Sequence, residues 1–107
     1  MSNSIQLTYV TFTNKEEADQ LCDMLIHKKL IACYNLFEME SGYFWEGAFC
    51  NEDEVVAILK SIPSKAELIQ KEIKGNHSYD IPCILSWQVS ANKDYYAWIC
   101  ECMNLNS

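Results

Sequence analysis

Residues 31–59, which read IACYNLFEMESGYFWEGAFCNEDEVVAIL, decide the fold that the sequence predicts. Two extended stretches rich in β-branched and aromatic residues, Ile31–Trp45 and Phe49–Leu59, flank the turn-forming pair Glu46-Gly47. Two such stretches joined by a tight turn are typical of a β-hairpin. The hairpin is longer than the other predicted elements, and Gly42 within its first strand indicates a bulge or a bend.

The residues before the hairpin predict a strand and then a helix. Ile5–Phe12 is rich in β-branched and aromatic residues, with apolar residues alternating at its start, as in a strand. The helix that follows ends near Lys28-Lys29, and its start carries two rival capping boxes, Asn14 with Glu17 and Thr13 with Glu16. Its apolar stripe has helical spacing and consists of Ala18, Leu21, Cys22 and Leu25.

The residues after the hairpin predict a helix, a strand and a further helix. Ser64 and Glu67 form a capping box for the first helix, and Gly75 is expected to end it. Pro82 is expected to begin a fourth strand, Cys83–Val89, because proline is tolerated at a strand start. A third helix follows, with Asn92 as its cap.

The predicted order is β-α-β-β-α-β-α, which is an α+β class. Its first six elements form the split βαβ arrangement of the ferredoxin-like fold, with an antiparallel sheet and two helices on one face. The long hairpin and the extra C-terminal helix are additions to that plan. A length of 107 residues suits a single domain, 1–107.

Composition excludes several classes of partner. The formal net charge is −7 and the sequence contains no arginine, which argues against nucleic acid as a partner. No run of 18 apolar residues is present, so no membrane partner is expected. The first residues lack the pattern of a signal peptide, and a cytoplasmic location is therefore expected.

Six cysteines are present, and none forms a Cys-x-x-Cys pair. This spacing argues against a zinc ribbon and against a thioredoxin-like redox site. In an intracellular protein we expect free thiols, which are usually buried as small hydrophobic residues. The sequence also lacks a nucleophile motif and a glycine-rich phosphate loop, so no enzyme activity is predicted.

A short polar segment carries the candidate metal ligands His77, Asp80 and Cys83. Imidazole, carboxylate and thiol within seven residues are ligands for a soft or borderline divalent ion such as copper or zinc. The alternative is structural: His77 hydrogen-bonds within the loop and Cys83 packs in the core. No other cofactor is predicted.

Glu52 and Glu54 are a second candidate pair, because residues two apart on a strand point the same way. Paired carboxylates bind hard cations or perform acid–base chemistry. The alternatives are a solvated strand face and an ion pair with Lys60.

The order of several short motifs resembles the CutA family, the divalent-cation tolerance proteins. The resemblance runs from Tyr9 to about Ile99, nearly the whole chain. The matching motifs are Ala32-Cys33-Tyr34-Asn35, Trp45-Glu46-Gly47, Glu52-Asp53-Glu54-Val55, His77-Ser78-Tyr79-Asp80-Ile81-Pro82 and Asn92-Lys93-Asp94-Tyr95-Tyr96-Ala97-Trp98.

The resemblance implies a ferredoxin-like subunit in a tight homotrimer, in which long hairpin strands pair with neighbouring subunits. It also implies a link to copper and other divalent cations. The alternative function is that of a trimeric scaffold like the PII signal proteins, which binds another protein without functional metal binding. The implied ligand-binding cleft between subunits involves Trp45, Glu52, Glu54, Lys60 and Tyr79.

The sequence departs from the family pattern at four places. The Pro-Gly bend after the Ala-Cys-x-Asn motif is missing, and Ala48 replaces the usual lysine after Trp-Glu-Gly. The His-Pro-Tyr motif reads His77-Ser78-Tyr79, and Pro-Glu reads Pro82-Cys83. A thiol in place of a carboxylate favours softer metals.

Overall fold

The structure is a computed structural model that describes residues 3–103, and it has the predicted α+β class. A short 3₁₀ turn, η1 (Pro63–Lys65), precedes the second helix. The strands and helices are β1 (Ser4–Phe12), α1 (Lys15–His27), β2 (Cys33–Trp45), β3 (Ala48–Ser61), α2 (Ala66–Asn76), β4 (Ile84–Ser90) and α3 (Lys93–Cys102).

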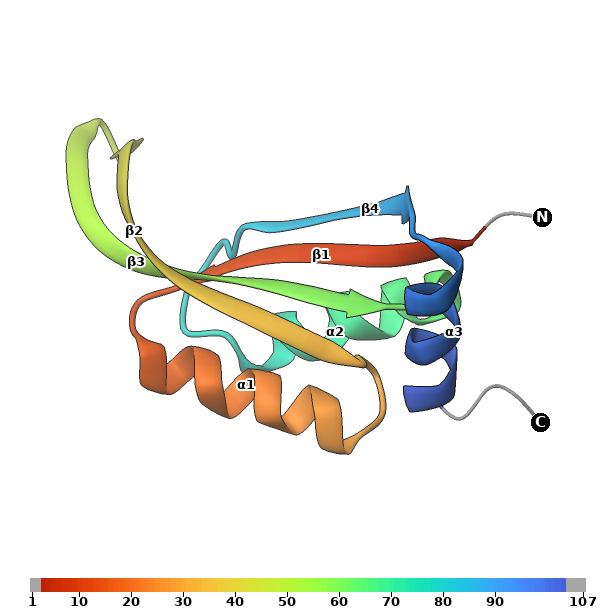
Figure 1. Cartoon of the computed structure of the whole chain (residues 1–107). Coiled ribbons are helices and arrows are strands. Elements are labelled where there is room, and N and C mark those ends of the chain that lie inside the picture. The colour runs from red at the N-terminus through yellow and green to blue at the C-terminus, as the bar shows by residue number, and fades with distance from the viewer. Residues whose placement is uncertain (1–2, 104–107) are drawn as a thin grey trace.

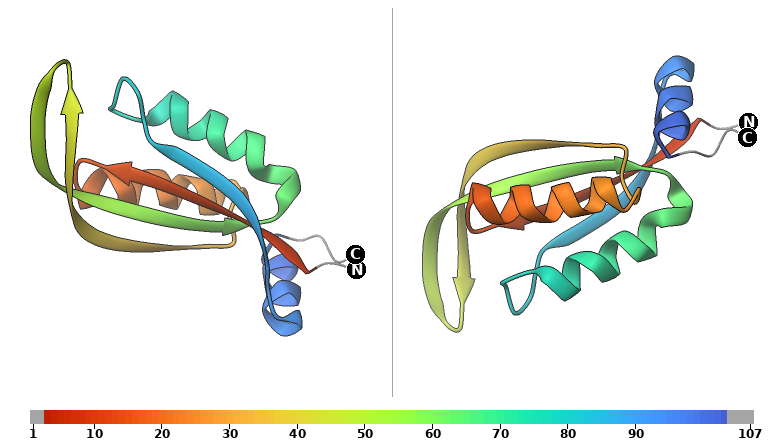
Figure 2. Two further views of the ribbon diagram at one scale, coloured as in Figure 1. Left: turned by 90° about the horizontal axis from the view of Figure 1, so that it is seen from above. Right: turned by 90° about the horizontal axis from the view of Figure 1, so that it is seen from below.

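The four strands form one antiparallel sheet in the order β2-β3-β1-β4. This is the order of the ferredoxin-like split βαβ arrangement, so the predicted fold is confirmed. Helices α1 and α2 lie side by side on one face of the sheet (Figures 1 and 2).

The core lies between the sheet and these two helices. Val10, Phe12 and Leu59 point from the strands toward the helices, because alternate residues of a strand share a face. Ile69 and Ile73 of α2 meet them and are fully buried. All four residues of the predicted α1 stripe are buried as well.

The hairpin pairs without interruption from Cys33 opposite Lys60 to Trp45 opposite Ala48. No residue is inserted at Gly42, so of the two predicted alternatives, a bulge or a bend, the bulge is wrong. The hairpin as a whole does curve toward the helix-free face (Figure 1). A Cβ atom at Gly42 would lie 3.4 Å from the Phe49 ring, so the glycine leaves room for that ring.

The predicted turn of the hairpin is confirmed. Glu46 and Gly47 have φ angles of 50° and 83°, the left-handed pair that a tight two-residue turn requires. Beyond the pairing of β3 with β1, which covers only Val55–Ser61, the hairpin projects past the rest of the sheet. Residues 48–54 therefore have β2 on one side, and no described strand of residues 3–103 pairs on the other.

The observed starts and ends of the helices can be compared with the predicted capping residues. The Asn14 side chain accepts a hydrogen bond from the Glu17 backbone N–H at 2.8 Å, so of the two rival capping boxes the one at Asn14 and Glu17 is observed.

The capping box predicted at Ser64 is wrong, because Pro63–Lys65 forms a 3₁₀ turn and α2 begins after it without a side-chain cap. Gly75 lies inside α2 instead of ending it. Asn92 stands at the start of α3 but makes no side-chain cap.

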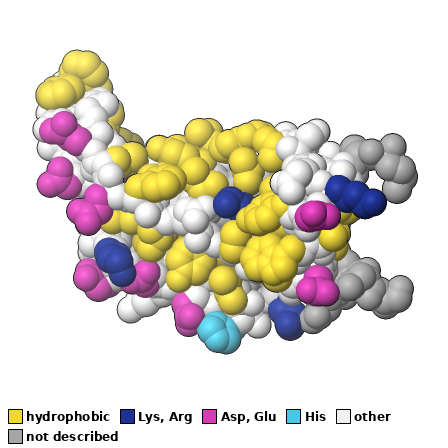
Figure 3. All heavy atoms as spheres, in the orientation of Figure 1, with side chains coloured by type: hydrophobic (Ala, Val, Ile, Leu, Met, Phe, Trp, Pro, Cys, Tyr) yellow, Lys and Arg dark blue, Asp and Glu magenta, His cyan; other side chains and the backbone are white. Residues whose placement is uncertain are grey.

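The opposite face of the sheet is only partly covered. Helix α3 crosses one end of it, where Ile5, Ile62, Ile99 and Met103 form a second buried cluster. Away from α3, hydrophobic side chains stay on the surface (Figure 3). We call this set the open-face patch; it comprises Phe37, Leu85 and Trp87, each 42–53% exposed.

Candidate functional site

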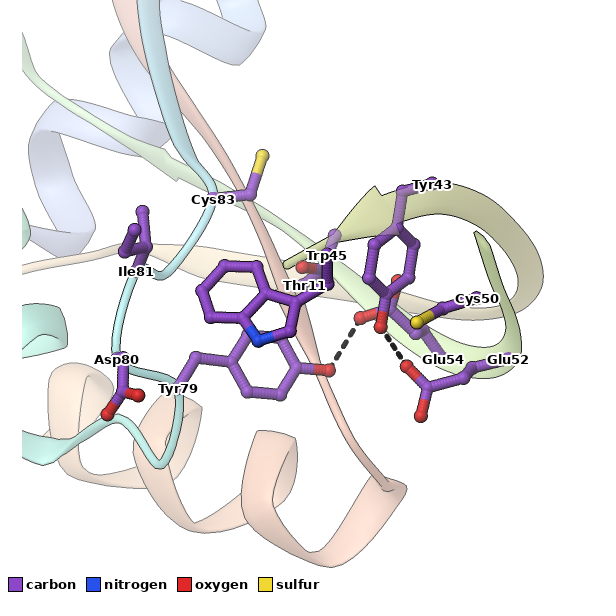
Figure 4. A pocket seen from close by; sticks show the side chains of 10 residues that line it. All are labelled: Thr11, Tyr43, Trp45, Cys50, Glu52, Glu54, Tyr79, Asp80, Ile81 and Cys83. Carbon is purple, nitrogen blue, oxygen red and sulfur yellow. Dashed lines mark hydrogen bonds between the residues drawn. The ribbon is translucent and has the colours of Figure 1, made fainter. Parts of the chain in front are cut away.

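A cavity of about 450 Å³ lies between the inner side of the curved hairpin and the segment that leads into β4 (Figure 4). Hairpin residues supply one wall, and residues 79–83 supply the other. The lining residues are Thr11, Tyr43, Trp45, Cys50, Glu52, Glu54, Tyr79, Asp80, Ile81 and Cys83.

Two tyrosine–glutamate hydrogen bonds organise the cavity. The Tyr79 hydroxyl donates to Glu54 Oε2 at 2.5 Å, and the Tyr43 hydroxyl donates to Glu52 Oε1. Glu54 is 9% exposed, whereas Glu52 is on the surface. Both glutamates line the cavity, which confirms that the two side chains share one face of β3.

The pKa values of both tyrosines are raised to about 12. For Tyr79 the main cause is burial, followed by the hydrogen bond to Glu54. For Tyr43 the main cause is the hydrogen bond to Glu52. A phenolate beside a carboxylate would be repelled and would lose the donated hydrogen bond.

We expect a spectrophotometric titration to show late tyrosine ionisation. The pKa values of Tyr43, Tyr79 and Tyr95 are raised to about 12, from about 10 for an ordinary tyrosine. Between these two values the folded tyrosines bind more protons than the unfolded ones, so their contribution makes the free energy of unfolding fall as pH rises above about 10 and adds no pH dependence well below it. Absorbance at the phenolate band should show midpoints that return to about 10 in denaturant. In Glu52→Gln one midpoint should fall, and unchanged midpoints in that variant would contradict the assignment.

His77 holds the cavity wall from behind. Its Nε2 donates to the Thr11 carbonyl at 2.6 Å, and its Nδ1 accepts from the Tyr79 backbone N–H at 3.0 Å. Its ring also stacks on Phe12, with ring centroids 4.9 Å apart. Glu17 accepts from the Ser78 N–H at 3.2 Å, which ties the same loop to α1. Both ring nitrogens of His77 therefore have partners within the chain.

The structure separates the three predicted metal ligands. Asp80 and Cys83 line the cavity, but His77 does not. Among residues 3–103, no three His, Cys, Asp or Glu side chains are grouped so that they could hold a metal ion. Desolvation, and then the charge of Glu54, raises the pKa of the Cys83 thiol, which disfavours the thiolate that metals bind. One described chain therefore does not complete a metal site by itself.

The structural alternative for this segment is half right. His77 does hydrogen-bond the loop, but Cys83 is exposed and does not pack in the core. The six cysteines are free thiols, as expected. The expectation that they are buried is wrong except for Cys22, because the others lie near the helix-free face or at element ends.

Of the five predicted cleft residues, Trp45, Glu52, Glu54 and Tyr79 line the cavity. Lys60 does not, because it lies six residues from Glu54 along β3, about 20 Å for an extended strand. Its Nζ stands 5.6 Å from the centroid of the Tyr95 ring instead. The predicted alternative of an ion pair between Lys60 and these glutamates is therefore wrong.

Sequence reasoning missed several lining residues. Tyr43 and Cys50 were predictable, because a hairpin centred on Glu46-Gly47 places them opposite each other and on the face of Glu52. Thr11 and Ile81 carried no such signal, since they reach the cavity only through the packing of the loop against β1.

The fold and the site define a ferredoxin-like domain with an extended hairpin and an acidic, aromatic cavity beside it. A model of the family described as CutA1 divalent ion tolerance protein matches residues 6–102. The chain belongs to the CutA1 family of divalent ion tolerance proteins.

Individual relatives agree with this assignment. The divalent-cation tolerance protein CutA of Thermotoga maritima is 36% identical over 89% of this chain and 95% of its own length. The CutA1 structure from Ehrlichia chaffeensis is 33% identical, covers 96% of this chain and 97% of its own, and has a TM-score of 0.90. The CutA structure from Archaeoglobus fulgidus is 33% identical, covers 92% and 98%, and has a TM-score of 0.89.

The relatives' names bear on location and activity. The Archaeoglobus fulgidus protein is described as periplasmic and one from Oryza sativa as chloroplastic, so a cytoplasmic location stays a prediction. Within residues 3–103, no helix has the length and apolar character needed to cross a membrane. The family is named for tolerance of divalent ions and not for a reaction.

Proposed function

We propose that this chain, as one domain, forms a homotrimeric, non-enzymatic divalent-cation tolerance protein. Divalent cations or a small ligand bind in the cavity where it meets a neighbouring subunit. The observation that carries the proposal is the cavity itself, whose charged lining residues are all acidic: Glu52, Glu54 and Asp80.

An unpaired strand edge and exposed aromatic side chains support assembly of the chain into a homotrimer. Within the described part of the chain, no strand pairs with the outer edge of residues 48–54, and such edges are normally covered or blunted. The open-face patch adds apolar area that a single subunit leaves in water. Four large aromatic side chains are also 42–65% exposed in the single chain: Trp45, Phe49, Trp87 and Trp98.

Light scattering tests the assembly. We expect a mass three times the 12.4 kDa of one chain at micromolar concentration. Trp87→Glu places a charge in the open-face patch, and we expect it to reduce the mass to that of a monomer, because a buried unpaired charge is costly. Leu68→Glu, on the exposed side of α2, is the matched control and should stay trimeric. A monomeric wild-type protein would contradict the proposal.

Metal binding in this proposal uses ligands from two subunits. Asp80 and Cys83 supply an oxygen and a sulfur, and a neighbour completes the coordination of copper or zinc. His77 joins them only by giving up one of its two hydrogen bonds. Because Cys83 must lose a proton to ligate, affinity should rise with pH.

Calorimetric titration with Cu(II) and Zn(II) tests this site. Cys83→Ser and Asp80→Asn should each weaken binding at least about tenfold, a typical loss for a metal ligand or its support. His27→Ala, an exposed histidine on α1, is the control and should leave the affinity unchanged. A trimer that binds neither metal, or binds it equally in all variants, would contradict the metal site and favour the PII-like scaffold.

A further inference from the structure

We propose that the cavity is a binding site for a small organic cation, such as an alkylated ammonium group. The inference rests on the proposed function only in using the same cavity as the ligand site. It requires neither the trimer nor a bound metal.

Three aromatic rings line the cavity, those of Tyr43, Trp45 and Tyr79. An aromatic face carries partial negative charge and attracts cations within about 6 Å of the ring centre. Clusters of such rings are the usual means of recognising quaternary ammonium groups, whose weak hydration makes them easy to transfer from water. The ring types therefore select a soft, bulky cation.

The hydrogen bonds of the two tyrosines hold their rings in place before a ligand arrives. Tyr43 is tied to Glu52 and Tyr79 to Glu54, so the hydroxyl of each ring is anchored at a carboxylate. Rings that are already positioned lose little conformational freedom on binding. Each anchor also brings a negative charge to the hydroxyl end of a tyrosine that lines the cavity.

The charges of the cavity fix the sign of the ligand. Glu52 and Asp80 lie on opposite sides of the rings in Figure 4, and no lysine is among the lining residues. An anion would be repelled from such a cavity, whereas a cation gains from both the carboxylates and the rings.

The volume of the cavity and the donor atoms around it argue against a bare metal ion as its ligand in a single subunit. A volume of about 450 Å³ lies in the range of small-molecule pockets. A transition metal needs three or four converging donors, and residues 3–103 provide no such group. Two of the three carboxylates already accept hydrogen bonds from tyrosine hydroxyl groups.

Choline and 3,3-dimethylbutan-1-ol, its neutral isostere, test the proposal in calorimetric titrations of the full chain. We expect choline to bind at least about tenfold more tightly than the alcohol, because only the charge differs. Trp45→Leu should lose about tenfold of the choline affinity, and Trp45→Phe should retain most of it. Glu52→Gln should also lower the affinity for choline but leave the affinity for the alcohol unchanged.

Two controls separate the cavity from the rest of the surface. Trp98→Leu removes an indole of similar exposure on α3, and Glu101→Gln removes an acidic charge there. Neither substitution should change choline binding. Three results would overturn the proposal. They are no choline binding at millimolar concentration, equal affinity for choline and the alcohol, or a Trp45→Leu variant with unchanged choline affinity. Copper or zinc binding without choline binding would leave the proposed function standing and refute only this inference.

Discussion

Replacing Phe12 with alanine is expected to lower the free energy of unfolding by about 3–5 kcal/mol, the cost of emptying a large buried site. Phe12 is 0% exposed at the end of β1 and belongs to the main core cluster. A loss of this size is a large part of the about 5–15 kcal/mol that stabilises a typical domain. Urea denaturation followed by circular dichroism measures it.

The same substitution should reach the cavity, because Phe12 supports the ring of His77. Phe12→Leu separates the two roles: it keeps most of the apolar volume but removes the aromatic stacking. We expect it to lower the free energy of unfolding less than Phe12→Ala does, because leucine leaves a smaller cavity. If Phe12→Leu reduces the free energy of choline binding by more than it reduces the free energy of unfolding, the stacking on His77 positions the cavity wall.

Leu68→Ala provides the matched control for packing. Leu68 is 47% exposed on α2, and alanine is the better helix former, so little stability should be lost. A loss comparable to that of Phe12→Ala would contradict the assignment of the core to the space between the sheet and the two helices.

The hairpin shows why the fold was predictable from the sequence. Alternation specifies which side of each strand is buried, and the Glu46-Gly47 turn fixes the pairing register of all thirteen residues of β2. Together they also place Glu52 and Glu54 on one face. Local signals of this kind are strong because they depend only on neighbours in the chain.

Local signals failed where tertiary packing decides. Ser64 is a residue type that often caps helices, yet it lies in a 3₁₀ turn. Ile62, just before this turn, is buried in the cluster formed with α3. Gly75 has the residue type of a helix end, but the helix continues to Asn76, whose side chain bonds back to the Glu72 carbonyl at 2.8 Å. The first outcome goes with packing against α3, whereas the second goes with a hydrogen bond inside the helix itself.

The candidate site illustrates the same division. Spacing in the sequence brought His77, Asp80 and Cys83 together as ligands, but a loop can turn its side chains in different directions. His77 points to the Thr11 carbonyl, 66 positions earlier in the chain, whereas the other two residues line the cavity. Lys60, which the family resemblance places in a cleft between subunits, does not line this cavity of a single chain, and its part in an intersubunit cleft stays a prediction.

Tyr79→Phe is expected to destabilise the fold by about 1–2 kcal/mol, the lower part of the range for a hydrogen bond to a charged group, because Tyr79 is only half-buried. Removal of its hydroxyl leaves Glu54, a 9% exposed carboxylate, without the donor at Oε2. A buried charge that loses its partner retains its full desolvation penalty. Thermal and urea unfolding of the variant measure the effect.

Tyr43→Phe is the matched control, because it removes the same kind of hydroxyl from an exposed glutamate. Water replaces the lost donor at Glu52, so the change in unfolding free energy should be smaller than for Tyr79→Phe. In a double-mutant cycle with Glu54→Gln, the Tyr79→Phe penalty should shrink, because a neutral amide tolerates the loss of the donor better. Equal penalties for the two tyrosines, or a penalty that Glu54→Gln leaves unchanged, would show that the pair does not hold the cavity wall.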